Sequence, residues 1–178
     1  MTIRSIHLLG SPVLRERSED VEKIDDSVKE LIQDLLDTTY ADDGLGLAAN
    51  QIGIARQVAV VVHGDEPPLF LINPKIVERD GEEREEEGCL SLPDLFADVK
   101  RPARVVVETL DLEGNTVRVE AEGIKARAIL HEFDHLNGVV FIDHLSPFKR
   151  RLMLKKWKKL RKGEVGYLKH LTLQSSEE

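Results

Sequence analysis

The sequence of 178 residues contains a single cysteine, Cys89. One thiol excludes a framework of internal disulfides, so we expect a reducing, cytoplasmic location. No apolar run approaches the roughly 18 residues that a membrane-spanning helix requires, and we expect no membrane partner. The first residues lack a basic segment followed by an apolar one, so we also expect no signal peptide.

The composition is typical of a soluble globular protein. Hydrophobic residues make up 41% of the sequence and charged residues 33%, a balance that argues against disorder. A chain of this length can bury a core of its own, and neither an internal repeat nor a linker divides it. We therefore predict one domain over residues 1–178, ending in a weakly ordered tail at 164–178.

The net charge of −8 is unevenly distributed. The segment Lys149–Lys162 holds nine Lys and Arg residues and no acidic one, which leaves 16 basic against 33 acidic residues elsewhere. Ser146 followed by Pro147 is a strong signal for the start of a helix. We predict a basic C-terminal helix over 146–163 that presents a separate contact surface, although a solvated helix face would have the same composition.

Apolar periodicity predicts the remaining elements. An amphipathic helix after Asp25 is indicated by apolar residues at helical spacing, namely Val28, Leu31, Ile32, Leu35 and Leu36. Alternating or β-branched runs predict strands at 57–63, 69–72, 75–79, 104–110 and 116–121, with a further short one at 139–142. The acidic residues 78–87 fit a solvated loop or an exposed hairpin. We predict an α+β fold, in which small antiparallel or mixed sheets pack around a central helix near 124–136.

That central helix carries the motif His131-Glu132-Phe133-Asp134-His135. Histidines four residues apart lie on one helix face, so both imidazoles can bind the same metal ion. Glu132 lies beside them and can reach a metal-bound water without ligating the metal. A solvated pair of histidines is the alternative interpretation of this motif taken alone.

A catalytic metal requires a third protein ligand and an open position for water. One class of metalloproteases places a third histidine six residues after the second, but Phe141 occupies that position here and cannot ligate. The best remaining donor is Cys89, next to a glycine that frees the backbone. A Cys-His-His set suits zinc or ferrous iron, which weakens the interpretation as a metal-dependent peptidase.

Three blocks of the sequence resemble the signature motifs of the peptide deformylase family. They are residues 44–51 (Gly-Leu-Gly-Leu-Ala-Ala-Asn-Gln), 87–91 (Glu-Gly-Cys-Leu-Ser) and 131–135. They follow one another in the family's order, and the similarity extends from residue 10 to residue 143. The resemblance implies a metal-dependent hydrolase that removes the formyl group from the N-terminal formylmethionine of new polypeptides and releases formate.

The resemblance also assigns roles to residues. It implies a divalent metal, ferrous iron with nickel, cobalt or zinc as alternatives, bound by Cys89, His131 and His135. A metal-bound water attacks the formyl carbonyl while Glu132 acts as general base and then acid. The resemblance gives the remaining site residues as Gln51 and the Leu90 N–H for stabilising the oxyanion, and Leu45 and Gly46 for binding the substrate.

Some positions depart from the family pattern or carry a structural expectation. Asn50 and Glu85 stand where relatives often place other residues, which leaves the specificity of the pocket rim open. Arg101 and Asp134 are expected to be structural, with Asp134 in a salt bridge or supporting a ligand.

The expected partners are formylmethionyl nascent peptides. The basic helix at Lys149–Lys162 resembles the element with which some family members dock on the ribosome, and weak, salt-sensitive docking is therefore expected without sequence-specific nucleic-acid binding. A non-catalytic ribosome- or RNA-binding protein with a structural metal is the other alternative.

Overall fold

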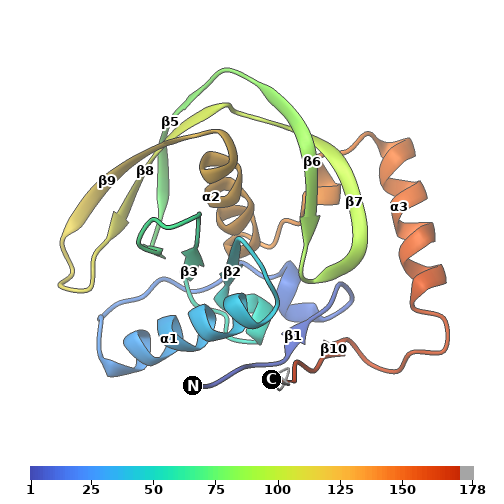
Figure 1. Ribbon diagram of the computed structural model, residues 1–178, viewed down its shortest axis with the longest axis horizontal. Helices are drawn as coiled ribbons and strands as arrows, with labels where there is room; N and C mark the ends of the chain where they lie inside the picture. Colours follow the sequence, from blue (N-terminus) through green and yellow to red (C-terminus); the bar gives the residue numbers. More distant parts are fainter. Residues whose placement is uncertain (173–178) are drawn as a thin grey trace.

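The structure, a computed structural model, describes residues 1–172, and its centre is the helix α2 (Gly123–Leu136). Within these residues, four small antiparallel sheets and two further helices surround α2 (Figure 1). The predicted α+β architecture is therefore confirmed. None of the helices in this part of the chain is long and apolar enough to cross a membrane.

Helix α1 (Asp26–Ala41) forms where the amphipathic pattern predicted it. The Asp25 carboxylate caps its first turn by accepting hydrogen bonds from the Ser27 and Val28 N–H groups. The apolar stripe predicted from the sequence is buried, and it packs with Leu47 and Val60 in one of the core clusters.

The sheets are short and every strand pair in them is antiparallel. The first contains β2 (Gly46–Ala48), β3 (Val58–Val61) and β4 (Leu69–Ile72). The second contains β5 (Lys75–Asp80), β8 (Arg104–Leu110) and β9 (Thr116–Glu122). The third is the hairpin of β6 (Glu83–Cys89) and β7 (Leu92–Arg101), and the last pairs β1 (Ile6–His7) with β10 (Leu168–Lys169).

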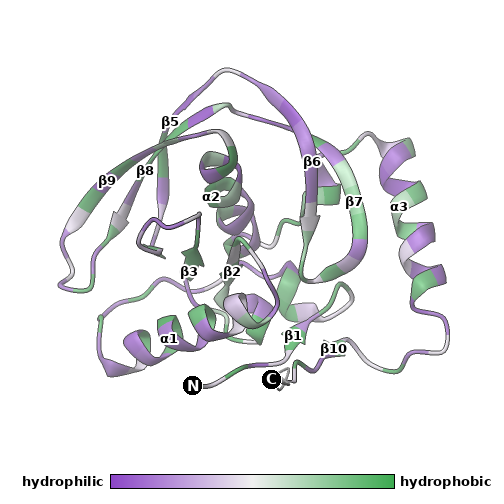
Figure 2. Ribbon diagram, in the orientation of Figure 1, coloured by the Kyte–Doolittle hydropathy of each residue, from purple (hydrophilic) through white to green (hydrophobic). Residues whose placement is uncertain are grey.

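The acidic residues 78–87 form neither a loop nor a hairpin of their own, so that prediction is wrong. Strand β5 pairs with β8, whereas β6 pairs with β7, and the chain changes sheet at Gly81, whose φ of 68° is in the left-handed region. Figure 2 shows β6 as hydrophilic along most of its length. Its last acidic residue, Glu87, is nevertheless buried.

The short apolar run at 139–142 does not form the predicted strand. The chain turns into a 3₁₀-helix, Phe141–His144, because Asp143 bends back and accepts a hydrogen bond from the Val140 N–H at 3.0 Å. Its apolar side chains explain the misleading pattern: Phe141 and Ile142 are buried in the core cluster around Trp157.

Helix α3 (Pro147–Leu160) is the basic helix, capped by Ser146, which accepts a hydrogen bond from the Lys149 N–H. Trp157 is its buried residue and donates an indole hydrogen bond to the Leu9 carbonyl at 3.1 Å. In Figure 1, α3 lies at one side of the molecule, beyond β7 from α2. One side of α3 is thus anchored to the core.

The expected tail at 164–178 is in part ordered by pairing, which corrects that expectation. Leu168 and Lys169 pair with His7 and Ile6, and the Lys169 ammonium lies 2.9 Å from a carboxylate oxygen of Asp42. The remainder of the predicted tail, 173–178, lies outside the described residues.

Candidate metal centre

The three predicted metal ligands converge from two elements. Cys89 ends β6, while His131 and His135 lie one turn apart on α2. The His135 Nε2 atom is 3.2 Å from both the Cys89 Sγ and the His131 Nε2, and the three donor atoms lie within 4.8 Å of one another. A thiol and two imidazoles gathered at this spacing fit a transition-metal ion such as zinc or ferrous iron.

An irregularity in the hairpin places Cys89 at this point. The β6–β7 register shifts between Gly88 and Cys89, so that Cys89 pairs with Leu92. A side chain at position 88 would collide with Phe96, since a Cβ there would lie 2.6 Å from its ring. The Ser91 N–H donates to the Cys89 Sγ at 3.4 Å and helps to fix the position of the sulfur.

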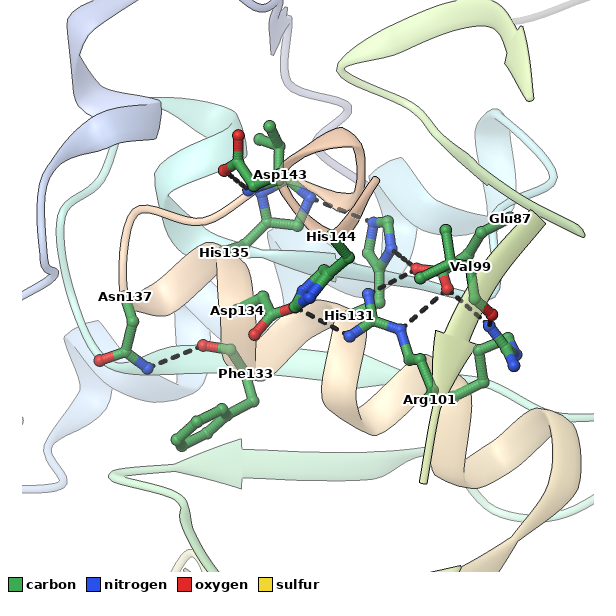
Figure 3. A network of polar contacts seen from close by, with 12 residues as sticks. Glu87, Val99, Arg101, His131, Phe133, Asp134, His135, Asn137, Asp143 and His144 are labelled. Carbon is green, nitrogen blue, oxygen red and sulfur yellow. Dashed lines mark hydrogen bonds and ion pairs between the residues drawn. The ribbon is translucent and has the colours of Figure 1, made fainter. Parts of the chain in front are cut away.

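Two neighbours hold the histidines in place. The His131 Nδ1 lies 2.7 Å from a carboxylate oxygen of Glu87, as Figure 3 shows, and this contact leaves Nε2 directed at the other ligands. The Asn50 side-chain amide donates to the His135 carbonyl at 2.6 Å. The departure at Asn50 therefore supports the end of the ligand-bearing helix.

Glu87 is an ionised carboxylate inside the protein. Burial raises its pKa, but the hydrogen bonds from Arg101 and His131 outweigh burial and hold the pKa well below its ordinary value. Arg101 donates to both Glu87 oxygens, at 2.8 and 2.6 Å, and to Asp134 at 2.8 Å (Figure 3). The expectation of a salt bridge at Asp134 is confirmed.

The two histidines are perturbed in opposite directions. Burial lowers the pKa of His131, but the hydrogen bond and charge of Cys89, followed by Glu87, raise it well above its ordinary value. Burial and the neighbouring His131 lower the pKa of His135 well below its ordinary value. The raised pKa of His131 favours a positively charged imidazole next to the Cys89 sulfur. A metal ion bound by the three side chains would also place positive charge there.

Glu132 is a buried carboxylate beside the three candidate ligands. It is 3% exposed, and its Oε2 has no hydrogen-bond partner within the described residues. Burial raises its pKa to about 7. Gly46 makes room for it, since a Cβ at position 46 would lie 2.9 Å from the Glu132 Oε1 and 2.7 Å from the Val60 carbonyl oxygen.

Gln51 reaches the same centre from the 3₁₀-helix Ala49–Ile52. Its oxygen accepts a hydrogen bond from the Ala48 N–H, which leaves its amide NH₂ directed at the Ser91 Oγ at 3.0 Å and the Cys89 Sγ at 3.7 Å. The amide therefore lies beside the ligands with its donor group toward them.

A cavity of about 860 Å³ opens onto these groups. Every predicted site residue except His135 lines it, namely Leu45, Gly46, Gln51, Cys89, Leu90, His131 and Glu132. Three large apolar side chains of its wall are more than half exposed: Leu45 at 53%, Ile124 at 58% and Phe96 at 59%. The cavity thus joins an apolar chamber to a small polar centre, as ligand sites commonly do.

Sequence reasoning missed the supporting roles of Glu87, Arg127 and Asn50. Spacing could have indicated two of them. Glu87 precedes Cys89 by two residues, a spacing that places side chains on one face of a regular strand, and Arg127 precedes His131 by one helical turn. Nothing local to Asn50 indicates its contact with a carbonyl 85 residues away.

A thiol, two histidines and a buried carboxylate whose Oε2 has no hydrogen-bond partner among residues 1–172 define a candidate mononuclear metallohydrolase. The family model described as polypeptide deformylase matches residues 3–151. A peptide deformylase of Rhizobium meliloti is 48% identical over 168 residues, covering 91% of this chain and 96% of the relative. One from Clostridium botulinum is 49% identical over 143 residues, covering 80% and 97%.

Solved structures agree with these sequence matches. A peptide deformylase from Legionella pneumophila superposes with a TM-score of 0.85 at 39% identity, covering 90% of this chain and 96% of that one. One from Ehrlichia chaffeensis in complex with actinonin gives 0.84 at 40% identity, covering 93% and 100%. The chain belongs to the polypeptide deformylase family and is an enzyme of that family.

Proposed function

We propose that this enzyme hydrolyses the N-formyl group from the N-terminal formylmethionine of newly synthesised polypeptides and releases formate. The observation that carries the proposal is the buried Glu132 carboxylate beside Cys89, His131 and His135, whose Oε2 has no hydrogen-bond partner in the described part of the chain. A base with a pKa of about 7 next to a metal-binding triad suits hydrolysis of an amide by water.

Cys89, His131 and His135 would hold one divalent metal, with ferrous iron proposed and nickel, cobalt or zinc able to occupy the same donor set. When bound, the metal supplies Lewis acidity, which lowers the pKa of a water molecule toward neutrality. Glu132 would accept the proton of the attacking water as the new C–O bond forms, and would return it to the amine nitrogen as the amide C–N bond breaks and formate is released.

Gln51 and the Leu90 backbone N–H are the proposed donors to the oxyanion that forms at the formyl carbon. The Gln51 amide is already directed at this centre, because its own oxygen is fixed by the Ala48 N–H. Such donors stabilise a transition state most when they are fixed beforehand, as a buried amide is. Loss of one typically lowers kcat by about 100- to 1,000-fold.

The apolar wall of the cavity is the proposed site for the methionine side chain, with Leu45 contributing an exposed surface. An unbranched thioether adapts well to an apolar chamber of this kind. Gly46 is proposed to let the peptide backbone approach β2, an edge strand that pairs with β3 on one side only. Actinonin, present in the Ehrlichia chaffeensis complex, is a proposed ligand of the same cavity.

The direct test is the release of formate from formyl-Met-Ala by the metal-loaded enzyme. Glu132→Gln should lower kcat by about 100-fold or more while metal content stays at the wild-type level. Glu120→Gln, the same change on an exposed residue of β9, is the matched control. Normal turnover by Glu132→Gln would remove Glu132 from the mechanism.

The same assay distinguishes the alternatives. A metal-dependent peptidase would release free alanine from the dipeptide, and a non-catalytic protein with a structural metal would release neither product. Formate release without peptide cleavage excludes both.

We further propose a cytoplasmic location, where a thiol ligand stays reduced, and weak ribosome docking through Lys149–Lys162. Among the described residues, Arg150 is the cation of this segment with an ion pair, to Asp143. The exposed residues Arg151, Lys155 and Lys158 leave charge on the outer side of the helix. Their conversion to glutamine should weaken co-sedimentation with ribosomes and leave formate release unchanged. Equal ribosome binding by this variant would exclude the helix as a docking element.

A further inference from the structure

Arg127 lines the cavity, and it also donates three hydrogen bonds to the β6–β7 hairpin beside the candidate metal centre. Its Nη1 donates to a Glu87 carboxylate oxygen at 2.9 Å and to the Val99 carbonyl at 2.8 Å. Its Nη2 donates to the Glu83 carbonyl at 3.0 Å. The residue is only 8% exposed; its contacts to Glu87 and Val99 are buried, and the contact to Glu83 is partly buried.

Arg127 and Arg101 both bind Glu87, and each connects the β6–β7 hairpin to α2 from a different side. Arg101 belongs to β7, and its pair with Glu87 therefore lies within the β6–β7 hairpin; Asp134 is its link to α2. Arg127 belongs to α2 and reaches both strands of the hairpin, at Glu83 and Glu87 on β6 and at Val99 on β7. It therefore spans the boundary between the two elements that supply metal ligands.

That boundary determines the geometry of the ligand set. Cys89 is carried by the hairpin, and His131 and His135 by the helix, so the distance from the thiol to the imidazoles depends on how the two elements dock. Arg127 binds the hairpin six residues before Cys89 and again two residues before it, and it lies one turn before His131. Its rigid, planar fork suits several acceptors held in fixed directions.

We propose that Arg127 is a positioning residue that sets the place of Cys89 relative to His131 and His135. The proposal rests on the metal-dependent function inferred above. Removal of the guanidinium leaves two carbonyl groups without their buried donor and leaves Glu87 with Arg101 as its remaining arginine. The hairpin then shifts against the helix, and the thiol loses its fixed distance from the imidazoles.

The test compares the metal-loaded wild type with Arg127→Met, which keeps an unbranched apolar stem and removes all the donors of the side chain. Release of the metal into excess chelator should be about tenfold faster, in the range known for residues that orient metal ligands. In the cobalt-substituted protein, the thiolate-to-cobalt absorption band should shift or weaken, because that band reports the geometry of the Cys89 ligand. Arg104→Met, the same change at an arginine of β8 outside the cavity, should match the wild type in both measurements.

Arg127→Lys keeps a positive charge for Glu87 but lacks the fork, so its release rate should fall between those of wild type and Arg127→Met. This variant carries the test if Arg127→Met does not fold. Wild-type release rates and cobalt spectra in both variants would overturn the proposal, even if the melting temperature fell. Neither measurement requires turnover. An absence of formate release by the wild type would therefore contradict the proposed function without affecting the test of Arg127.

Discussion

Arg101 and Arg104 are three residues apart in the chain, and each is the centre of a cluster of carboxylates. Arg101 is 4% exposed and pairs with Glu87 and Asp134 beside the metal centre. The Arg104 side chain is 26% exposed and pairs with carboxylates on β5 and β9 that are themselves open to solvent, namely Glu78, Asp80 and Glu120. The same pairing of an arginine with carboxylates thus occurs once in the protein interior and once in contact with water.

The difference shows what burial adds to an ion pair. Water screens the Arg104 cluster and would solvate its members if the pairs broke, so these contacts contribute little to folding. The Arg101 cluster has no such alternative, and every charge in it requires its partner. As a consequence, the buried cluster can hold the His131 ring in one orientation through Glu87, because water does not compete for these contacts.

The largest expected effect comes from breaking the buried cluster. Arg101→Met leaves Glu87 and Asp134 without their shared cation and should lower the free energy of unfolding by about 3–5 kcal/mol. Urea unfolding of the metal-free protein measures this change without interference from bound metal. If Arg101→Met lowered the free energy of unfolding no more than Arg104→Met does, the buried cluster would not differ from the exposed one.

The next effect concerns the carboxylate that orients His131. Glu87→Gln keeps an acceptor for the His131 N–H but removes the charge that Arg101 and Arg127 neutralise. Metal affinity should fall by about 10- to 100-fold, measured by competition with a chelator of known affinity. Glu86→Gln, the exposed neighbour on β6, is the control. Unchanged affinity in Glu87→Gln would show that His131 is oriented by other contacts.

Asp143 is intermediate in burial between the two clusters. Its side chain is 20% exposed and pairs with Arg15 and Arg150. Burial raises its pKa, but the hydrogen bonds from Arg15 and the Val140 N–H outweigh burial and lower the pKa below its ordinary 3.8. A depressed pKa contributes stability that is complete above the ordinary value and is lost as the pH falls through the depressed one. Asp143→Asn should therefore cost about 1 kcal/mol near pH 7, in line with partly exposed pairs.

The difference between wild type and Asp143→Asn should shrink as the pH falls below about 4, when the wild-type carboxylate becomes protonated. Unfolding free energies measured from pH 7 to pH 3 test this. Arg15→Met should flatten the same pH dependence, because it removes the main cation that lowers the pKa. A difference that is constant with pH would assign the effect of Asp143→Asn to packing.

The smallest effect is expected for Arg104→Met. Although the hydrogen bonds that Arg104 donates to the Glu120 and Glu78 carboxylates raise its pKa, the residue is solvated, and the urea midpoint should stay within experimental error. Any loss should diminish further in high salt, since mobile ions screen exposed pairs. A clear loss of stability that persists in high salt would show that the Arg104 cluster stabilises the fold as much as the buried cluster does.

The sequence predicted those features whose signal is local. Helix α1 followed from apolar spacing and α2 from the spacing of its two histidines, while the grouping of Cys89 with them followed from residue chemistry together with the family resemblance. Glu87 was hidden because its segment is acidic, and only contacts to Arg101 and Arg127, 14 and 40 residues away, show why it is buried. The pairing of β10 with β1 joins opposite ends of the chain, which no local pattern reports.

The run at 139–142 illustrates a second limit. Three of its four apolar residues, Val140, Phe141 and Ile142, are buried, and burial alone does not distinguish a strand from a short helix. The deciding contact is the Asp143 carboxylate, which replaces a strand partner for the Val140 N–H. A side chain that substitutes for backbone pairing is difficult to recognise from periodicity.

The exposed Leu45, Phe96 and Ile124 around the cavity have a thermodynamic consequence. A peptide that covers them removes apolar surface from water, which gives a negative change in heat capacity on binding. The binding enthalpy should therefore become more favourable as temperature rises, with a slope set by the apolar area covered. Calorimetry at several temperatures would measure how much of this wall each ligand occupies.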